Sequence, residues 1–422
     1  MEPGNGTRPA AGVVEPVAAA TDLLPEPDSE ATEHPNEAAQ RPLPPPDALP
    51  REGVAAPRLL EALDAMRRAD ADWEGGRTWS MVYYAGPEHH ALMREATGKY
   101  LAANALNPMA FKSLKRMEQD VVRMSLRLLN APREASGILT AGGTESILLA
   151  VKAYRDYARR RWPWILRPEI VAPSTVHVAF DKAAHYFGLR IRYVEVDEQF
   201  RAIPERVERA IGRNTILVVA SAPQYPHGSV DPIAEIGAIA ERRGVPFHVD
   251  ACVGGFMLPW LERLGVQLPV FDFRVPGVTS MSADVHKYGY APKGASVILY
   301  RSMRHMRHQF FISTDWSGGI YASPGVLGSR PGGPIAAAWA SLLSLGEEGF
   351  LRLTESAWET AQRLRRGIEQ IDELRLLGAP HSTIVTYGAR DEAISMFAVA
   401  DELERRGWSV DRQQRPASIH LT

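Results

Sequence analysis

The stretch of sequence that decides the fold is GILTAGGTESILLAVKAYRDYARRR, residues 137–161. It begins with a short apolar run, turns at Gly142 and Gly143, and continues with apolar residues spaced three and four apart. This order predicts a β-strand, a tight turn and an amphipathic helix. We therefore expect the stretch to form one strand–turn–helix unit.

The same pattern recurs towards the C-terminus, where short apolar runs alternate with longer helical segments. Such alternation predicts a mostly parallel sheet with helices on both faces, which is the α/β class. Sheets of this class bind ligands at the carboxyl ends of their strands. The further units are EIVAPSTVHVAFDKAAHYFG (169–188), TILVVASAPQYPHG (215–228), DPIAEIGAIAERRG (231–244), VPFHVDACVGG (245–255) and VTSMSADVHKYGYAPKGASVILY (278–300).

The composition along the chain changes three times, which divides it into four parts. Residues 1–55 are acidic, Pro-rich and poor in large apolar side chains, which predicts a disordered tail. Residues 56–130 have helical spacing, and residues 131–340 form the large α/β domain. Residues 341–422 form a smaller α/β domain. Around its start we predict helices over 334–350 and 353–371, followed by a strand over 382–388 and a helix over 392–407.

Composition excludes several classes of protein. The 422 residues carry a formal net charge of −2 and are 45% hydrophobic and 23% charged, so no basic field points to nucleic acid. Cys252 is the only cysteine, so no intrachain disulfide can form. No apolar run is long enough to span a membrane, and we expect a cytoplasmic location. We assign no metal site.

Four polar features follow predicted strands, and each has an ordinary structural alternative. Gly143 and Thr144 form a turn before a helix, where backbone N–H groups can bind an anion, although Thr144 could simply cap that helix. Asp250 ends an apolar strand, where a carboxylate needs a positive or donating partner, and it too could be a helix cap. His177 could lie against a ligand or be a satisfied structural histidine.

The fourth feature is Lys287, in the stretch MSADVHKYGYAPKG (281–294). Only seven of the 48 lysines and arginines are lysines, and this stretch holds two of them, Lys287 and Lys293. We expect a lysine at an apolar strand end beside a histidine to have a lowered pKa and to react as an amine, which an arginine cannot do. The alternative is a solvated loop lysine.

Together the four features fit pyridoxal 5'-phosphate, although each alone is a weak signal. This cofactor needs an amine for its aldehyde, an anion pocket for its phosphate, a carboxylate at its ring nitrogen and a flat group against its ring. In that order, the groups that could serve are Lys287, the Gly143-Thr144 turn, Asp250 and His177.

Five longer stretches resemble the sphingosine-1-phosphate lyase family, within the group II pyridoxal-phosphate-dependent decarboxylase superfamily. The resemblance runs from about residue 75 to the C-terminus. It implies a fold-type I architecture, with a mostly parallel seven-stranded sheet, helices on both faces and a smaller C-terminal domain. It also implies a homodimer with shared active sites. The stretches are TAGGTESILLAVKAYRD, PQYPHGSVDPI, FHVDACVGGF, FDFRVPGVTSMSADVHKYGYAPKGASVILY and TDWSGGIYASPGVLGSRPGG.

The resemblance assigns a role near the cofactor to each of several residues. Lys287 carries the cofactor, Asp250 pairs with its ring nitrogen, and His177 stacks on its ring. Three residues match positions near the cofactor phosphate, and two more complete that pocket from the partner subunit. The first three are Gly143, Thr144 and His286, and the other two are Ser329 and Gly332.

The reaction that the resemblance implies is cleavage of the C2–C3 bond of a phosphorylated sphingoid base. The products are a long-chain aldehyde and phosphoethanolamine. Tyr83 and Lys293 line the pocket for the substrate phosphate, and Tyr225 lies close to the reacting hydroxyl. Lys287, Tyr225 and His177 thus form the expected catalytic set.

Two departures from the family pattern bear on this reading. The run Asn104-Ala105-Leu106-Asn107-Pro108 has Asn107 where the family has a histidine that lines the substrate phosphate site, and asparagine cannot carry charge. The sequence given ends at SIHLT (418–422), where the family continues, so we expect an incomplete small domain with exposed apolar surface. Two alternatives therefore stay open: an amino-acid decarboxylase with the same cofactor, and an inactive remnant.

Overall fold

The computed structural model describes residues 49–422, so most of the predicted tail over residues 1–55 lies outside the described residues. Residues 49–55 form no helix or strand, and helix α2 (Ala56–Arg67) begins where helical spacing begins in the sequence. The chain divides into two compact units, one ending at Asp70 and the other extending from Ala71 to Thr422. Every further element named here belongs to the second unit.

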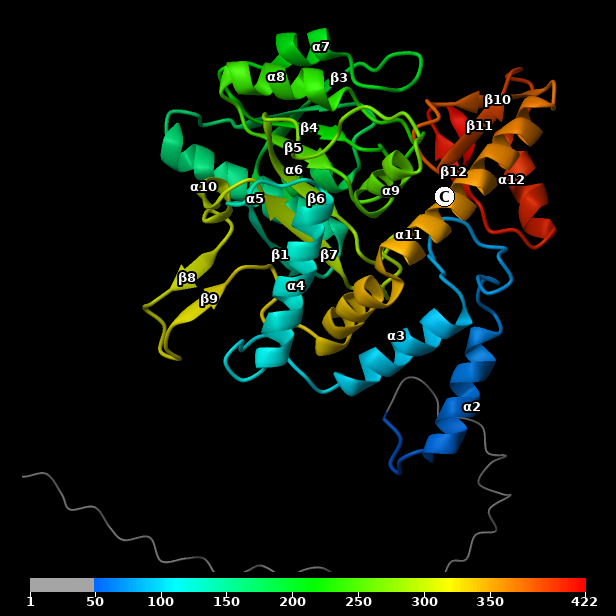
Figure 1. The fold of residues 1–422 in the computed structure, drawn as a ribbon, viewed down its shortest axis with the longest axis horizontal. Coiled ribbons are helices and arrows are strands. Elements are labelled where there is room, and N and C mark those ends of the chain that lie inside the picture. The colour runs from blue at the N-terminus through cyan, green and yellow to red at the C-terminus, as the bar shows by residue number, and fades with distance from the viewer. Residues whose placement is uncertain (1–48) are drawn as a thin grey trace, which may run out of the picture. The chain divides into compact units, whose positions relative to one another are not determined.

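The second unit is built on a seven-stranded sheet with the strand order β1-β7-β6-β5-β4-β2-β3 (Figure 1). β7 pairs antiparallel with β1 and with β6, and the remaining pairs are parallel. The mostly parallel seven-stranded sheet is therefore confirmed. The strands are β1 (Ser136–Thr140), β2 (Glu169–Pro173), β3 (Arg190–Val194), β4 (Thr215–Ser221), β5 (Phe247–Asp250), β6 (Val278–Ala283) and β7 (Ser296–Tyr300).

Helices cover both faces of this sheet because its central strands are apolar on both sides. In β4, Val218 and Ala220 belong to one buried apolar cluster and Val219 to another. The first cluster takes in side chains of α4, α8 and α9, and the second takes in side chains of α5 and α6. The helices are α4 (Lys112–Leu128), α5 (Gly143–Arg161), α6 (Ala179–Phe187), α7 (Pro204–Ala210), α8 (Ile233–Arg243), α9 (Leu258–Arg263), α10 (Met303–Met306) and the short 3₁₀ helix η1 (Gly254–Phe256).

The long helix α11 (Gly332–Glu369) connects the large sheet to the small domain (Figure 1). It packs against α3 (Pro87–Lys99) and α4 near its start and against the small sheet near its end. At Gly346 the backbone leaves helical geometry, with φ 56° and ψ −176°, which kinks the helix. The two helices predicted over 334–350 and 353–371 are therefore one kinked helix, whose break at Gly346 lies inside the first predicted range.

The small domain is an antiparallel sheet with the strand order β10-β11-β13-β12, covered by helix α12 (Met396–Arg405). Its buried core includes Tyr387, Met396, Ala400 and Ile419. Among the described residues from 371 onwards, the large apolar side chains that are exposed are Ile371 and Phe397. The strands are β10 (Leu374–Leu377), β11 (Val385–Ala389), β12 (Asp411–Gln414) and β13 (Ala417–Leu421).

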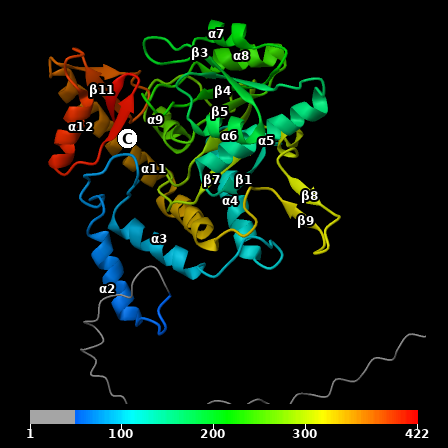
Figure 2. The ribbon, with the colours of Figure 1, turned by 180° about the vertical axis from the view of Figure 1, so that it is seen from behind.

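A two-stranded hairpin, β8 (Phe311–Ser313) with β9 (Tyr321–Ser323), projects from the large sheet (Figures 1 and 2). Its apolar side chains face solvent, with Trp316 57% and Ile320 79% exposed. Within residues 49–422, none of the helices is both long enough and apolar enough to cross a bilayer.

Candidate active site

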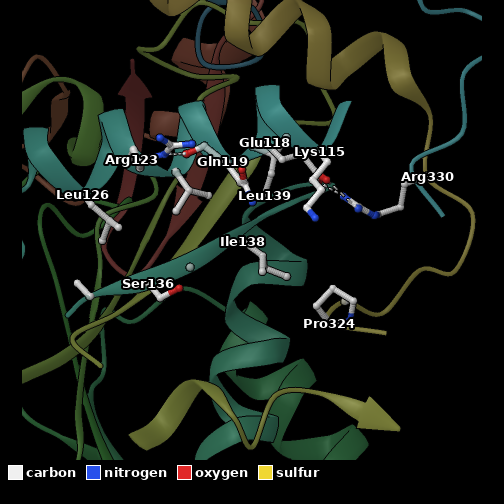
Figure 3. A pocket seen from close by; sticks show the side chains of 14 residues that line it. Lys115, Glu118, Gln119, Arg123, Leu126, Ser136, Ile138, Leu139, Pro324 and Arg330 are labelled. Atoms are coloured by element: carbon white, nitrogen blue, oxygen red, sulfur yellow. Dashed lines mark hydrogen bonds and ion pairs between the residues drawn. The ribbon is translucent and has the colours of Figure 1, made fainter. Parts of the chain in front are cut away.

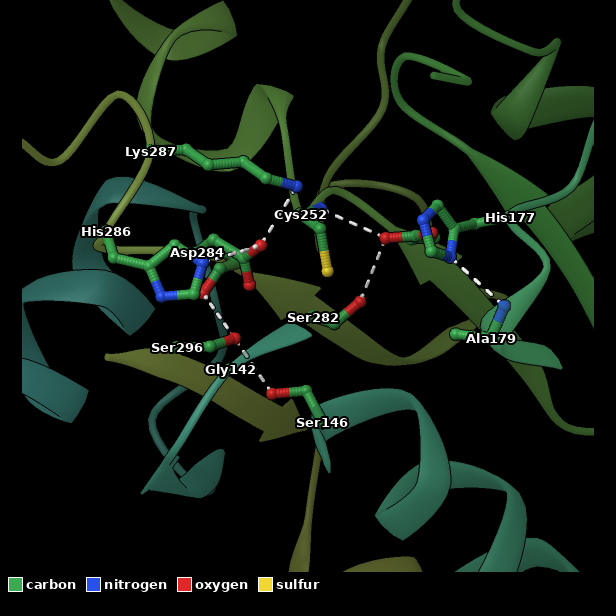
Figure 4. A network of polar contacts seen from close by, with 12 residues as sticks. Gly142, Ser146, His177, Ala179, Cys252, Ser282, Asp284, His286, Lys287 and Ser296 are labelled. Atoms are coloured by element: carbon green, nitrogen blue, oxygen red, sulfur yellow. Dashed lines mark hydrogen bonds and ion pairs between the residues drawn. The ribbon is translucent and has the colours of Figure 1, made fainter. Parts of the chain in front are cut away.

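The polar features that follow the strands meet in one cavity at the carboxyl ends of the sheet. Its volume is about 460 Å³. Figure 4 shows how side chains from the ends of β5 and β6 and from the β2–α6 connection point towards the turn that follows β1. The lining residues are Ala141, Gly142, Gly143, Thr144, Glu145, Ile147, His177, Asp250, Cys252, Asp284, His286 and Lys287.

The turn after β1 presents backbone N–H groups to this cavity. Helix α5 begins at Gly143 without a side-chain N-cap, so Thr144 does not cap it and the structural alternative for Thr144 does not hold. A Cβ atom on Gly143 would lie 2.8 Å from both carboxylate oxygens of Asp284 and 2.9 Å from Cys252 Sγ. Only glycine therefore fits this position without displacing its neighbours.

Glu145 ties the turn to the loop that follows the hairpin. Its Oε2 accepts a hydrogen bond of 2.6 Å from the Ala141 N–H, and its Oε1 accepts one of 2.9 Å from the Val326 N–H. A single carboxylate thus holds the start of α5 and a segment far along the chain in one arrangement.

Asp250 is 6% exposed and is held by donors at the end of β5. Its Oδ1 accepts hydrogen bonds from the Cys252 N–H at 3.0 Å and from Ser282 Oγ at 3.2 Å. Ser282 lies opposite Asp250 in the β5–β6 register, and its Oγ also lies 3.2 Å from His248 Nε2. Burial lowers the pKa of His248 to about 4, so this histidine is neutral and adds no charge beneath Asp250.

Lys287 forms an ion pair with Asp284, whose side chain is almost completely buried. Lys287 Nζ lies 3.0 Å from Asp284 Oδ2, and His286 Nε2 lies 3.5 Å from the same oxygen. Burial alone would lower the pKa of Lys287, but the charge of Asp284 outweighs it and raises that pKa above its ordinary value. The lowered pKa that we expected for Lys287 is therefore wrong. Burial would raise the pKa of Asp284, but Lys287 and His286 lower it.

The lowered pKa belongs instead to Lys293, six residues along. Burial, followed by the nearby charge of Lys287, lowers the pKa of Lys293 to about 8. Lys293 Nζ donates to the His286 carbonyl at 3.1 Å and lies 4.9 Å from the centre of the Tyr83 ring. Lys293 and Tyr83 line a second, largely apolar cavity of about 520 Å³. His286 lines both cavities, so the two adjoin.

Tyr225 lies beside the first cavity, where its ring meets the edge of the His177 ring at a centroid distance of 6.4 Å. His177 Nδ1 accepts a hydrogen bond of 3.1 Å from the Ala179 N–H, which fixes the imidazole at the start of α6. The Tyr225 hydroxyl donates to Asp411 Oδ2 at 2.7 Å. Burial and Asp411 raise the pKa of Tyr225, so the phenol stays protonated.

Besides Tyr225, three predicted site residues line neither cavity within one chain. Asn107 Oδ1 accepts from the N–H groups of Met109 and Ala110, which stabilises a local turn. Ser329 Oγ accepts a hydrogen bond of 3.1 Å from Asn104 Nδ2. Gly332 begins α11 and packs against Ala103.

Sequence reasoning missed several residues that shape the site: Glu145, Cys252, Ser282, Asp284 and Asp411. The contact between Asp284 and Lys287 could have been predicted, because a carboxylate three residues before a lysine at a strand end can reach the lysine amine. The contact between Asp411 and Tyr225 could not have been predicted, because the two residues are 186 positions apart in the sequence.

The residues around the first cavity fit the groups that pyridoxal phosphate needs. The glycine turn lines the cavity at the uncapped start of α5, Lys287 offers an amine, and Asp250 offers a carboxylate held in place by two donors. His177 is a flat group on the same cavity wall.

Comparisons with known proteins agree with this arrangement. The sequence profile of the pyridoxal-dependent decarboxylase conserved domain matches residues 74–390. A sphingosine-1-phosphate lyase from Arabidopsis thaliana is 45% identical over 383 residues, which cover 89% of this chain and 70% of the plant protein. Sphingosine-1-phosphate lyase 1 from Rattus norvegicus is 44% identical over 374 residues, which cover 88% of this chain and 65% of the rat protein.

A solved structure, that of the sphingosine-1-phosphate lyase Bpss2021 from Burkholderia pseudomallei K96243, superposes with a TM-score of 0.85. It is 42% identical and covers 92% of this chain and 90% of its own. This chain spans 65–70% of the length of the plant and rat relatives. The chain therefore belongs to the pyridoxal-dependent decarboxylase family and, within it, to the sphingosine-1-phosphate lyases.

Proposed function

We propose that the chain is a pyridoxal-phosphate-dependent lyase that cleaves the C2–C3 bond of phosphorylated sphingoid bases such as sphingosine 1-phosphate. The products are a long-chain aldehyde and phosphoethanolamine. The observation that carries the proposal is the meeting of Lys287, Asp250 and His177 with the Gly142-Gly143 turn in one cavity. The second cavity, which adjoins at His286 and holds Lys293, supports it further.

Pyridoxal phosphate, when bound, supplies an aldehyde that reacts with amines and a ring that withdraws electrons from the bond to be broken. The backbone donors at the start of α5, with Thr144 and His286 beside them, bind its phosphate. Asp250 would hold a proton at the ring nitrogen, and the imidazole of His177, fixed by its hydrogen bond, would face the ring.

Lys287 supplies the amine of the site, and Asp284 raises the pKa of that amine. Because the pKa of Lys287 is raised, its nitrogen becomes nucleophilic only after it gives up a proton. Asp284 Oδ2 accepts a hydrogen bond from Nζ at 3.0 Å, so it holds the amine in position and stabilises its protonated form.

The substrate lies across the boundary between the two cavities in this proposal. Lys293 is the cation for its phosphate, with Tyr83 beside it, and the largely apolar wall of the second cavity suits hydrocarbon. Tyr225 lies on the side of His177 and accepts the proton of the reacting hydroxyl. Asn107, Ser329 and Gly332 do not line these cavities, so in this proposal they act from a second copy of the chain.

We infer a homodimer with shared active sites from two surfaces of the large domain. The first is the β8–β9 hairpin and its loop, with the exposed apolar side chains Phe311, Ile312, Trp316 and Ile320. The second is a groove of about 490 Å³ between α4 and the edge strand β1, bounded at one end by Pro324 and Arg330 (Figure 3). A second copy would cover the apolar hairpin and bring its own 324–332 segment to a neighbouring site. The cytoplasmic location stays a prediction.

The test is incubation of the purified protein with pyridoxal phosphate and sphingosine 1-phosphate, with mass detection of both products. We expect equal amounts of long-chain aldehyde and phosphoethanolamine. Lys287→Ala is expected to abolish both products and the visible absorbance of the lysine-bound cofactor. Lys182→Ala is the matched control, because Lys182 lies on the exposed side of α6, and it is expected to behave as the unmodified protein.

Each contrary outcome identifies a different error. Release of carbon dioxide from amino acids without any aldehyde would replace the lyase with an amino-acid decarboxylase. If the protein folds but binds no pyridoxal phosphate, it is an inactive remnant of the family.

A further inference from the structure

One hydrogen bond joins the small domain to Tyr225 beside the active site. Asp411, the first residue of β12, accepts the hydroxyl proton of Tyr225 at 2.7 Å. Tyr225 is on the loop after β4, in the large domain, beside His177 on the cavity wall. The bond therefore links a strand of the small sheet to a side chain next to the reacting groups.

The surroundings hold this pair in place. Asp411 lies opposite His420 in the β12–β13 register, and the His420 ring packs against the Tyr225 ring at a centroid distance of 4.3 Å. Burial lowers the pKa of His420 to about 4, so His420 is neutral and does not compete as a cation for the Asp411 carboxylate. The Tyr225 ring thus contacts both His177 and His420, and its hydroxyl is directed at Asp411.

The direction of the hydrogen bond limits what Tyr225 can do towards a substrate. A phenol has one proton, and here that proton points at Asp411. Its oxygen can then only accept a hydrogen bond from a ligand hydroxyl. A substrate hydroxyl at this position must be a donor, which is the orientation required of a hydroxyl that is to lose its proton.

We propose that Asp411 is a positioning residue that acts through Tyr225, by making the Tyr225 oxygen a proton acceptor and by taking up the proton that Tyr225 releases. This inference rests on the proposed function. As the substrate O–H bond breaks, its proton bonds to the Tyr225 oxygen, the Tyr225 O–H bond breaks, and its proton bonds to Asp411 Oδ2. The electron pair of the substrate O–H bond forms the second C–O bond of the aldehyde as the C2–C3 bond breaks, and the C2–C3 electron pair stays on C2, where the electron-withdrawing cofactor would stabilise it. One carboxylate is neutralised, and charge and protons balance.

The decisive variant is Asp411→Asn, which keeps the size and an acceptor oxygen but cannot take up a proton. With sphingosine 1-phosphate as the probe, we expect kcat to fall by roughly 10- to 100-fold while KM and the visible absorbance of the bound cofactor stay unchanged. Asp401→Asn is the matched control: Asp401 forms an ion pair with Arg412, the neighbour of Asp411, but does not contact Tyr225. We expect its kcat to be normal.

A double-mutant cycle separates action through Tyr225 from a general effect on the small sheet. If Asp411 acts through Tyr225, Asp411→Asn lowers kcat in the normal background but has little further effect in the Tyr225→Phe background. Equal effects in the two backgrounds would overturn the proposal, and so would a normal kcat in Asp411→Asn.

Folding and the proposed function are checked separately. If Asp411→Asn lowers the melting temperature, Asp411→Glu, which keeps a carboxylate, becomes the test, and we expect its kcat to exceed that of the Asn variant at least tenfold. Equal kcat values for these two variants would also reject the role of Asp411. Absence of aldehyde from the unmodified protein would reject the proposed function itself, whereas aldehyde release with a normal Asp411→Asn variant would reject only this inference.

Discussion

Lys287 and Lys293 lie on the same connection between β6 and β7, yet their surroundings move their pKa values in opposite directions. Lys287 has a buried carboxylate 3.0 Å from its nitrogen, so its charged form is stabilised. Lys293 is held by a carbonyl oxygen and an aromatic ring and is repelled by Lys287, so burial dominates. Near neutral pH both are charged, but only Lys293 loses its proton under mildly alkaline conditions.

This difference predicts the alkaline limb of the pH profile. The pKa of Lys293 is lowered to about 8, so its charge is present below that pH and is lost above it. If Lys293 binds the substrate phosphate, kcat/KM for sphingosine 1-phosphate should fall above pH 8 by up to about tenfold per unit. Lys293→Arg stays protonated and should move this limb to higher pH. Identical alkaline limbs for the two proteins would contradict a role for Lys293 in phosphate binding.

At the scale of single residues, the sequence predicts which groups lie at strand ends better than it predicts their partners. The sheet carries His177, Asp250 and Lys287 to one edge, because each follows a strand that runs in the same direction. The sequence does not reveal which charged side chains lie next to each of these three residues. The rise in the pKa of Lys287 depends on the side-chain geometry of Asp284, which no periodicity encodes.

At the scale of elements, the strand–turn–helix unit of β1 and α5 depends on close packing behind its glycines. Gly143 has the carboxylate of Asp284 and the sulfur of Cys252 where a Cβ atom would go. At the adjacent Gly142, the nearest atom to a Cβ would be His286 Cε1, at an ordinary contact distance of 3.5 Å. The two neighbouring glycines therefore differ in their tolerance of a methyl group.

We accordingly predict that Gly143→Ala lowers the free energy of unfolding of the cofactor-free protein by roughly 1–3 kcal/mol. Gly142→Ala is the matched control and should change it little. Chemical denaturation without pyridoxal phosphate measures both, so any effect on cofactor binding stays separate. Equal stabilities for the two variants would show that the carboxylate and the sulfur can move aside freely.

Two strands that the sequence did not predict share a physical cause. β3 (Arg190–Val194) is an edge strand with mostly exposed side chains, so it lacks an apolar run, and β12 (Asp411–Gln414) has no apolar residue at all. Both are strands because a neighbour pairs with their backbone, which is a tertiary effect. The buried strand β4 and the amphipathic helix α5 were predicted because burial leaves its pattern in the sequence.

At the scale of the whole molecule, the hairpin exposes apolar side chains that nothing within one chain covers. Trp316 and Ile320 lie on its loop, and a second copy of the chain would remove them from water. Such a surface suits a permanent interface between identical subunits.

We therefore expect sedimentation experiments to detect a dimer and the double variant Trp316→Ser with Ile320→Ser to shift it towards the monomer, with loss of aldehyde release. Trp164→Ser with Leu166→Ser is the matched control, because these exposed side chains lie on a loop on another part of the large domain. A hairpin variant that stays dimeric, or an unmodified protein that is a monomer, would place the interface elsewhere or remove it.

The antiparallel pairing of β1 with β7 also sets an order of events during folding. β1 has β7 as its neighbour, and the two are separated in the chain by everything from α5 to β6. During synthesis, β1 and the glycine turn behind it must wait for nearly the whole large domain to emerge before they can join the sheet. Closing so long a loop is slow. The glycine turn is thus among the first parts of the large domain to be made and among the last to reach its place, so a half-made chain lacks the cavity that this turn lines.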